Sequence, residues 1–253
     1  RGIPTYETKD LGVIFMERDD YDFTRRFLIT GTEQTAYMRT VFAVADLVQP
    51  GIKAEMTHIG NGLVKFGDGR KMSSRLGNAT RAVDAIEAVR ERVRPLVTDE
   101  SLVNDIALGA VKYQFLKYRV GGDIAFDVDE SVSIAGNSGP YLQYAHARVC
   151  GILQKAGDVE TTTVAAEYDP AERALLRKIS ENAEVQERAA LELMPHYICS
   201  YLYELAQEFN RFYEQSRVIG DERQAIRMGI ITIYRDVLAS NLALLGITAP
   251  ERM

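Results

Sequence analysis

The chain has 253 residues, which is enough for one large or two ordinary domains. Hydrophobic residues make up 46% and charged residues 26% of it, so the composition is that of a globular protein and excludes a disordered or fibrous one. The formal net charge is −6, so any binding of RNA must rest on local surfaces and on shape rather than on overall charge.

The sequence also sets expectations about the compartment. Two cysteines are too few for a disulfide framework and fit a reducing cytosol. No apolar run approaches the roughly 18 residues of a membrane span, and no signal peptide is visible. We therefore expect a cytoplasmic protein without a membrane partner. Because the chain begins with Arg1 rather than methionine, we also expect it to be a piece of a longer protein.

The first hundred residues predict short strands separated by a helix. Residues 27–30 form an apolar, β-branched run, and a helical pattern follows over residues 37–48. Residues 57–59 and 63–66 then have the character of strands. Strand, helix, strand is typical of a βαβ unit, so this part of the chain is predicted to be α/β.

After Pro95 the apolar periodicity is helical almost to the end. Helices are expected after Thr98 or Asp99, over residues 140–157, after Pro170, after Pro195 and over residues 221–245. Asp169, Pro170 and Glu172 have the spacing of a capping box. Long helices joined by short loops predict a bundle. The threonine-rich residues 159–166 are predicted to be an exposed linker.

Between these two parts lies a short basic segment, Lys71-Met72-Ser73-Ser74-Arg75, with glycines on both sides. Two cations flank two hydroxyl groups on a segment that can move, which suits a triphosphate that is held briefly and then released. The alternative is an ordinary surface loop of the same composition.

A cluster of polar residues near the N-terminus predicts a small-molecule site. Tyr6 and Asp10 are four residues apart, and Glu33 and Gln34 follow the first predicted strand. Ligands of α/β sheets lie at the carboxyl ends of strands. A carboxylate, an aromatic wall and an amide could hold a guanidinium or ammonium group. The alternative is that these are ordinary surface and core residues.

The helix after Ser138 predicts a surface for unpaired bases. Tyr141, Tyr144 and Arg148 lie at positions i, i+3 and i+7, on one face of the helix. Two aromatic rings and a cation could stack on bases and fix them. The alternative is that the tyrosines pack inside the bundle.

Three other patterns are set aside. His58-Ile59-Gly60-Asn61 is similar to the His-Ile-Gly-His motif of class I aminoacyl-tRNA synthetases, but its last histidine is replaced and it lies too close to Lys71. His146 and Cys150 are four residues apart, but no second close pair completes a tetrahedral metal site, so no metal site is predicted. Three scattered histidines indicate no Ser-His-Asp arrangement.

Taken together, motifs along the whole chain resemble the C-terminal part of the arginyl-tRNA synthetase family. The segments that carry the resemblance are Tyr6-Glu7-Thr8-Lys9-Asp10, Gly31-Thr32-Glu33-Gln34, Lys71-Met72-Ser73-Ser74-Arg75, Gly109-Ala110-Val111-Lys112-Tyr113, Gly136 to Arg148, Phe209-Asn210-Arg211-Phe212-Tyr213 and Pro250-Glu251-Arg252-Met253. The lysine segment alone indicates only a class I synthetase. The Pro140-Tyr141-Leu142-Gln143-Tyr144-Ala145 run and the terminal Pro-Glu-Arg-Met narrow the resemblance to the arginine enzyme.

The resemblance implies a fold and a reaction. Residues 1–138 would be the C-terminal half of a Rossmann-type catalytic domain with its helical extension, and residues 139–253 a helical anticodon-binding domain. The family uses ATP with Mg²⁺ to activate arginine and then transfers it to the 3′ end of its tRNA. Family precedent suggests a monomer.

The resemblance also implies roles for single residues. Tyr6, Asp10 and Gln34 would bind arginine, in agreement with the chemistry argued above. The mobile loop that stabilises the departing pyrophosphate would contain Lys71, Ser73, Ser74 and Arg75. The residues that approach the anticodon loop would be Tyr141, Tyr144, Arg148, Tyr213 and Met253.

Three departures from the family pattern matter. Ser74 stands where the second lysine of the loop would be, so Arg75 can carry the second charge. Tyr37 stands where many relatives have a histidine. The His-Ile-Gly-His segment and the first half of the nucleotide-binding fold are missing from the chain, so we expect it to bind tRNA weakly and not to aminoacylate. Two alternatives remain, a free-standing RNA-binding module without catalysis and a plain helical interaction domain that binds no RNA.

Overall fold

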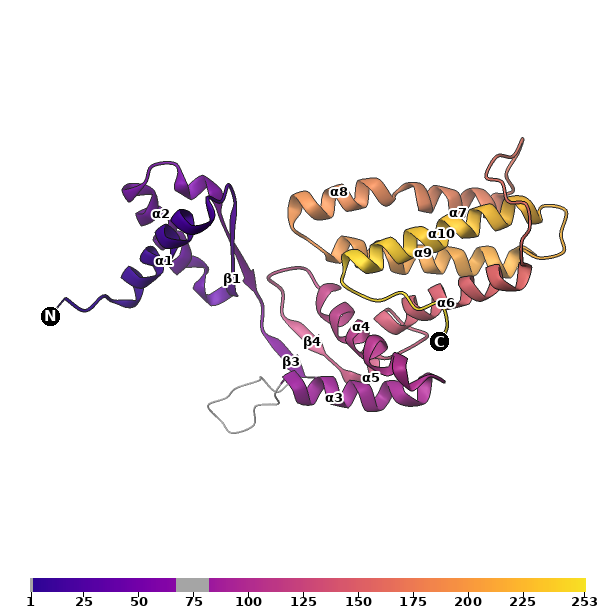
Figure 1. The fold of residues 1–253 in the computed structure, drawn as a ribbon, viewed down its shortest axis with the longest axis horizontal. Coiled ribbons are helices and arrows are strands. Elements are labelled where there is room, and N and C mark those ends of the chain that lie inside the picture. Colours follow the sequence, from indigo (N-terminus) through magenta and orange to yellow (C-terminus); the bar gives the residue numbers. More distant parts are fainter. Residues whose placement is uncertain (1, 67–81) are drawn as a thin grey trace. The chain divides into compact units, whose positions relative to one another are not determined.

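The structure, a computed structural model, describes residues 2–66 and 82–253, which belong to two compact units. The first unit consists of Arg1–Val64 and Val120–Ile124, and the second of Lys65–Arg119 and Ala125–Met253. In Figure 1, Arg1–Val64 of the first unit is the indigo to purple part of the ribbon, and the helices of the second unit run from magenta to yellow. Each unit is described by itself.

The first unit is built on a βαβ motif. It contains α1 (Tyr6–Tyr21), β1 (Arg26–Gly31), α2 (Thr35–Val48) and β2 (Met56–Asn61). The strands β1 and β2 pair in parallel, with Leu28 opposite His58, and α2 is the crossover between them. The predicted strand, helix, strand arrangement is therefore confirmed.

The helices α1 and α2 pack over one face of this two-stranded sheet. Their shared core contains Ile14 of α1 and Met38, Val41, Phe42 and Ala45 of α2, with Leu28 of β1 packed against it. On the other face of β1, the side chains of Phe27 and Ile29 are 44% and 61% exposed. Parallel sheets are usually covered on both faces. The described residues cover only one.

The helix α1 was not predicted as a helix. Ile14 is its only fully buried residue, and the exposed apolar side chains of Val13 and Met16 obscure the stripe that Leu11, Ile14 and Phe15 present to the core. The helix ends at Asp22, which adopts a left-handed conformation (φ 43°) while its N–H bonds the carbonyl of Arg18.

A second small sheet joins segments that are far apart in the sequence. The predicted strand at residues 63–66 is confirmed as β3 (Val64–Phe66), but it pairs with β4 (Ile124–Phe126) instead of extending the β1–β2 sheet. Next to it the backbone runs unusually close, since a Cβ atom on Gly62 would lie 2.1 Å from the carbonyl oxygen of Gly122. Only glycine fits there.

The second unit is helical. Its helices are α3 (Ala82–Val93), α4 (Val103–Leu116), α5 (Val128–Ser131), α6 (Gly139–Ala156), α7 (Pro170–Ser180), α8 (Asn182–Glu192), α9 (His196–Gln215) and α10 (Gln224–Leu244). The predicted bundle is therefore confirmed, although α3, α5 and α8 were not predicted. The helix α10 begins three residues after the predicted Asp221, because the Asp221 carboxylate accepts a hydrogen bond from the N–H of Arg223 and holds a turn before the helix.

The core of the second unit lies around α9. Leu202, Leu205 and Phe209 of this helix are completely buried, and the ring of Phe209 stacks on Tyr234 of α10 with 4.2 Å between ring centres. Figure 1 shows α7, α8, α9 and α10 as a group of long helices that lie side by side. This bundle is a rigid frame for the side chains on its surface.

The start of α6 is fixed by its cap and by a close helix crossing. The hydroxyl of Ser138 accepts a hydrogen bond from the N–H of Tyr141 at 3.1 Å. A Cβ atom on Gly139 would lie 2.4 Å from the carbonyl oxygen of Gly109 in α4, so the glycine lets the two helices approach. Because α4 packs on α6, both belong to the same compact unit, and the units do not follow the predicted domain division at residue 138. That division stays a prediction.

The threonine-rich segment at residues 159–166 forms no helix or strand, and most of it is exposed, as predicted. It is nevertheless anchored, because the N–H of Thr162 donates to the carbonyl of Ala225 at 3.1 Å. Among the described residues, no helix combines the length and the apolar character that a membrane crossing requires.

Candidate functional site

A cavity of about 230 Å³ lies between α1, β1 and α2 in the first unit. The residues that line it are Tyr6, Asp10, Val13, Ile14, Glu17, Arg26, Leu28, Thr30, Gln34, Met38, Val41 and Phe42. The structure thus brings together the three residues predicted to bind a cationic ligand, Tyr6, Asp10 and Gln34. Glu33, which follows the same strand, is exposed and does not line this cavity.

The polar groups of the cavity are linked through Tyr37, a residue of the first turn of α2. Its hydroxyl donates a hydrogen bond to Oδ2 of Asp10 at 2.7 Å, and its ring lies 5.7 Å from that of Tyr6. Its withdrawal from solvent, together with the hydrogen bond to Asp10 and the charge of that carboxylate, raises the pKa of Tyr37. The hydroxyl therefore stays protonated and able to donate.

The electrostatics of the cavity leave one carboxylate available for a ligand. Glu17 forms an ion pair with Arg26, with 2.5 Å between Oε2 and Nε. Asp10 has no cationic partner among the described residues, and its carboxylate accepts a hydrogen bond from Tyr37. A half-buried carboxylate beside an aromatic ring and an amide is suited to bind a guanidinium or ammonium group.

The segment predicted to stabilise the departing pyrophosphate cannot be located relative to this cavity. Lys71, Ser73, Ser74 and Arg75 lie outside the described residues. Their role stays a prediction from the sequence.

Of the two tyrosines predicted to form an aromatic face on α6, one is exposed and the other packs against a neighbouring helix. The side chain of Tyr144 is 43% exposed, whereas Tyr141 is half-buried and packs on Tyr203 with 5.6 Å between ring centres. The hydroxyl of Tyr141 accepts a hydrogen bond from Nδ2 of Asn210 at 3.0 Å, and burial raises its pKa. Of the two rings, that of Tyr144 is the freer to stack on a base.

Arg148 of α6 and Tyr213 of α9 lie far apart in the sequence but are in contact in the structure. The guanidinium carbon of Arg148 lies 4.7 Å from the centre of the Tyr213 ring, a cation–π contact. Its Nη1 also approaches Oδ1 of Asn210 at 3.4 Å. Asn210 was not singled out from the sequence, although the Phe209 to Tyr213 segment contains it, because its two contacts appear only in the fold.

The C-terminal segment lies along α6. Nε2 of Gln143 donates to the carbonyl of Thr248, and Nδ1 of His146 is hydrogen-bonded to the carbonyl of Pro250, both at 2.8 Å. Met253 follows this anchored segment and is half-buried. His146 therefore has a structural partner. Among the described residues, no group of three or more His, Cys, Asp and Glu side chains is arranged to hold a metal ion.

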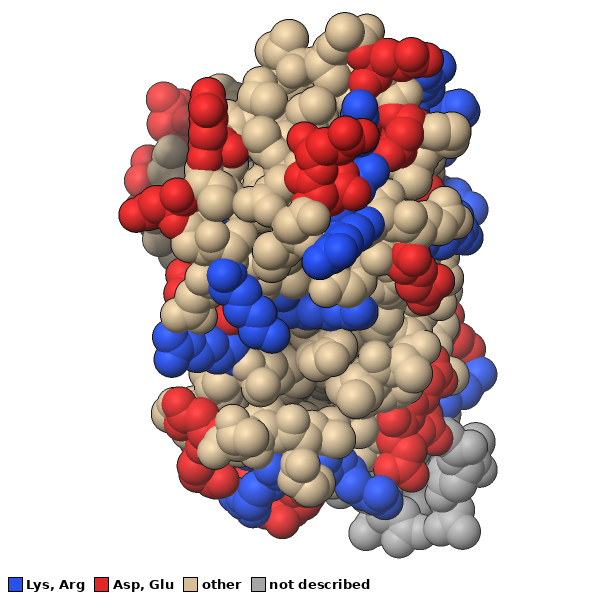
Figure 2. Space-filling model, turned by 90° about the vertical axis from the view of Figure 1, so that its right-hand side faces the viewer, with Lys and Arg blue, Asp and Glu red and all other residues tan. Residues whose placement is uncertain are grey.

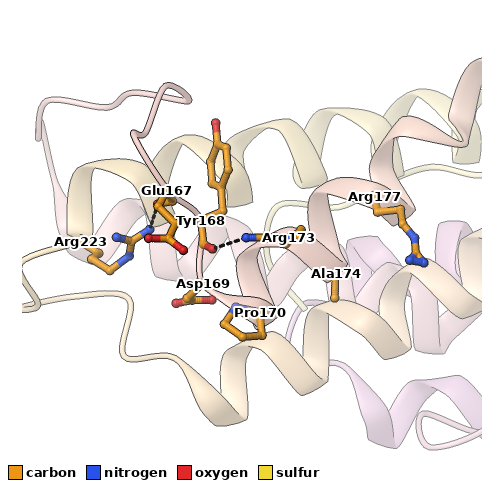
Figure 3. Close-up of a pocket in the computed structure, with 8 residues that line it drawn as sticks. All are labelled: Glu167, Tyr168, Asp169, Pro170, Arg173, Ala174, Arg177 and Arg223. Atoms are coloured by element: carbon orange, nitrogen blue, oxygen red, sulfur yellow. Dashed lines mark hydrogen bonds between the residues drawn. The ribbon is translucent and has the colours of Figure 1, made fainter.

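A larger cavity, of about 610 Å³, lies at the start of α7 (Figure 3). Its lining comprises Glu167, Tyr168, Asp169, Pro170, Arg173, Ala174, Arg177 and Arg223. Its charges are mostly bound to one another or to neighbours: Arg223 binds Glu172, and Asp169 binds Arg227. The sequence analysis did not foresee this cavity, and we assign no ligand to it.

On the face shown in Figure 2, basic side chains lie among acidic and uncharged ones, so neither sign of charge dominates this face. RNA binding on such a surface depends on local contacts. His58, set aside in the sequence analysis, lies within β2, and its Nε2 is 2.7 Å from the hydroxyl of Thr30.

Comparisons with known proteins agree with this geometry. Residues 1–128 match the family described as tRNA synthetases class I (R), catalytic domain, and residues 142–253 match the DALR anticodon binding domain. The chain is 36% identical over 262 residues to an arginine–tRNA ligase of Frankia casuarinae, covering 98% of this chain and 45% of that protein. It is 32% identical over 268 residues to an arginine–tRNA ligase of Flavobacterium psychrophilum, covering 100% of this chain and 44% of that protein.

Solved structures give the same answer. The arginyl-tRNA synthetase of Thermus thermophilus superimposes with a TM-score of 0.88 at 26% identity, covering 100% of this chain and 50% of that one. That of Plasmodium falciparum superimposes with a TM-score of 0.82 at 21% identity, which shows the fold alone. The chain spans about half the length of the relatives it matches. Its motifs, its fold and these matches together show that the chain belongs to the class I arginyl-tRNA synthetase family.

Proposed function

We propose that this chain forms the C-terminal part of an arginine–tRNA ligase, in which residues 1–138 bind arginine and residues 139–253 bind the anticodon region of its tRNA. The observation that carries this proposal is the cavity in which Tyr6, Asp10 and Gln34 meet. The whole reaction would activate arginine with ATP and Mg²⁺ and transfer it to tRNA.

The arginine cavity can select its ligand by charge and by shape. The Asp10 carboxylate would accept hydrogen bonds from the guanidinium group, and the Tyr6 ring would lie against its plane. The amide of Gln34, at the start of α2, would bind a polar atom of the same ligand. Apolar residues such as Val13 and Met38 line the rest of the cavity and would contact the aliphatic part of the side chain.

The lysine segment would serve the chemical step. Lys71 and Arg75 would stabilise the negative charge that develops on the departing pyrophosphate, and Ser73 and Ser74 would donate hydrogen bonds to it. This part of the proposal rests on the sequence motif and the family.

The helical unit would bind RNA through a small aromatic and cationic surface. Tyr144 would stack on an unpaired base, and Arg148, held over the Tyr213 ring, would bind a base edge or a phosphate. Tyr141 would support this surface through its bond to Asn210, and Met253 would add an apolar contact at its border.

Two assays of the 253-residue chain test the proposal. In filter-binding titrations we expect tighter binding of an arginine tRNA than of an unrelated tRNA across a salt series. In an ATP–pyrophosphate exchange assay we expect no arginine-dependent turnover from this chain alone, because half of the nucleotide-binding fold is not part of it. Turnover would contradict the second expectation. Equal affinity for both tRNAs would contradict the first, and tRNA binding without any arginine binding would favour a non-catalytic RNA-binding module.

The substitution Tyr144→Ala is expected to weaken binding of the arginine tRNA about tenfold, since stacking of one base on an aromatic ring contributes roughly 1–3 kcal/mol. Because no charge is removed, the slope of log K against log salt should stay the same. Tyr21→Ala, which removes a 77% exposed tyrosine from the first unit, is the matched control and should leave the affinity unchanged. Equal affinities for the two variants would show that Tyr144 does not stack on the RNA.

A further inference from the structure

The contact between Tyr37 and Asp10 lies at the polar end of the arginine cavity. Tyr37 belongs to the first turn of α2, three residues after Gln34, and Asp10 belongs to α1. Tyr37 itself does not line the cavity, but its hydroxyl reaches Oδ2 of Asp10 at 2.7 Å and its ring lies 5.7 Å from that of Tyr6. One side chain therefore contacts two of the three residues assigned to the ligand.

The plane of the Asp10 carboxylate matters for a guanidinium ligand. The terminal torsion of an aspartate side chain is broad, so a carboxylate without partners samples many orientations. A guanidinium group presents two parallel N–H bonds and needs both carboxylate oxygens in its own plane. A lysine ammonium group behaves as a point charge and has no such requirement.

From this geometry we propose that Tyr37 is a positioning residue for arginine recognition, whose hydroxyl fixes the plane of the Asp10 carboxylate for a bidentate bond to a guanidinium group. The inference rests on the proposed function and deepens it, since it assigns to Tyr37 the preference for a guanidinium over an ammonium ligand. The Tyr37 hydroxyl occupies one acceptor direction of Oδ2 and leaves the remaining ones for the ligand.

The anchoring of Tyr37 supports this role. Its ring packs against the core formed by α1 and α2, which includes Ile14, Met38 and Phe42. A hydroxyl on a ring fixed by such packing has little freedom to follow a moving carboxylate, so the carboxylate adjusts to it. The ring of Tyr37 also contacts that of Tyr6, the aromatic side chain of the cavity.

The test is isothermal titration of the 253-residue chain with L-arginine, and with L-lysine by competition against arginine. Tyr37→Phe keeps the ring and removes the hydroxyl. Without the hydroxyl, the Asp10 carboxylate is free to rotate and must be ordered when the guanidinium group binds, so we expect about a tenfold loss of arginine affinity with little change for lysine. The arginine-to-lysine affinity ratio should therefore fall about tenfold. In an Asp10→Asn background, where no carboxylate remains to form the bidentate bond, adding Tyr37→Phe should change arginine affinity much less than it does in the unchanged chain.

A second measurement requires no ligand. Asp10 contributes to the raised pKa of Tyr37, so in an NMR titration of the tyrosine Cζ signals the pKa of Tyr37 should be lower in Asp10→Asn than in the unchanged chain. Tyr21→Phe is the control for the substitution itself, because Tyr21 is exposed at the end of α1, and it should alter neither readout.

The outcomes separate the inference from the function on which it rests. If the unchanged chain binds no arginine, the proposed function fails and the inference fails with it. If arginine binds and Asp10→Asn weakens it, but Tyr37→Phe leaves the arginine-to-lysine ratio unchanged, the arginine site stands and the positioning role is overturned. Equal losses for both ligands would likewise show that Tyr37 supports only the general shape of the cavity.

Discussion

Asp10→Asn is expected to weaken binding of L-arginine to this chain by roughly 30- to 100-fold, or about 2 to 3 kcal/mol. Asp10 is the carboxylate of the cavity that has no cationic partner among the described residues, because Glu17 is already paired with Arg26. The amide of asparagine has nearly the same size and still accepts the hydrogen bond from Tyr37, so the cavity should keep its shape. The loss then reports the missing charge, and isothermal titration at constant salt measures it.

The control for this variant removes a carboxylate from the same helix. Asp19 is exposed on α1 and does not line the cavity, so Asp19→Asn changes the net charge equally but should alter arginine affinity by less than about twofold. If both variants bound arginine equally well, Asp10 would not contact the ligand. A loss shared equally by both would indicate only a long-range effect of charge.

The sequence predicted the parts of the fold whose local signals agree with their tertiary environment. The β1–α2–β2 unit was predicted because an apolar run, a helical stripe and a second apolar run follow one another. The start of α7 was predicted because Asp169 and Glu172 cap it reciprocally through purely local hydrogen bonds. In both cases the pattern that predicts the secondary structure lies within the same short stretch of sequence that forms it.

The sequence could not predict elements held mainly by contacts from outside. The helix α1 fully buries one side chain, Ile14, and α8 also fully buries only one, Ala189, so the apolar signal of each helix is weak. Both are stabilised by packing on a neighbouring helix, α1 on α2 and α8 on α9, which is a property of the tertiary structure. The pairing of β3 with β4 was equally hidden, because the two strands, Val64–Phe66 and Ile124–Phe126, lie far apart in the sequence.

The same distinction applies to the candidate sites. Tyr6, Asp10 and Gln34 could be grouped from residue chemistry, strand ends and a family resemblance, and one cavity does contain them. The hydrogen bond from Tyr37 to Asp10 could not, because 27 residues separate the two on different helices. Likewise, the half-buried state of Tyr141 depends on Tyr203 and Asn210 of another helix. Sequence patterns thus predicted which residues form the candidate sites, while the relative orientation of these residues required the structure.

A buried charge network links α7 to α10 and makes Glu172 the second position with a large expected effect. Its side chain is completely buried, and Oε1 accepts hydrogen bonds from Nε of Arg223 at 2.8 Å and Nε of Arg227 at 3.1 Å. Its other oxygen accepts one from the N–H of Asp169 at 3.1 Å. Glu172→Gln leaves both guanidinium groups without this anion, and removing one partner of a buried ion pair costs about 3 kcal/mol. Urea unfolding at pH 7, followed by the helical circular dichroism signal, measures the loss.

The pH dependence of the same variant provides a sharper test. Desolvation opposes ionisation of Glu172, but the hydrogen bonds from Arg223, the Asp169 N–H and Arg227 outweigh it and lower the pKa of the carboxyl from 4.5 to about 2. A lowered pKa stabilises the folded state fully above pH 4.5, and this contribution is lost as the pH falls toward 2. The stability difference between the unchanged chain and Glu172→Gln should therefore shrink by roughly 1 to 2 kcal/mol between pH 7 and pH 3.

The control is Glu187→Gln, at an exposed position on α8, which should lower the free energy of unfolding by less than about 0.5 kcal/mol at either pH. A difference that stayed constant with pH would mean that the network stabilises the fold by packing rather than through the charge of Glu172.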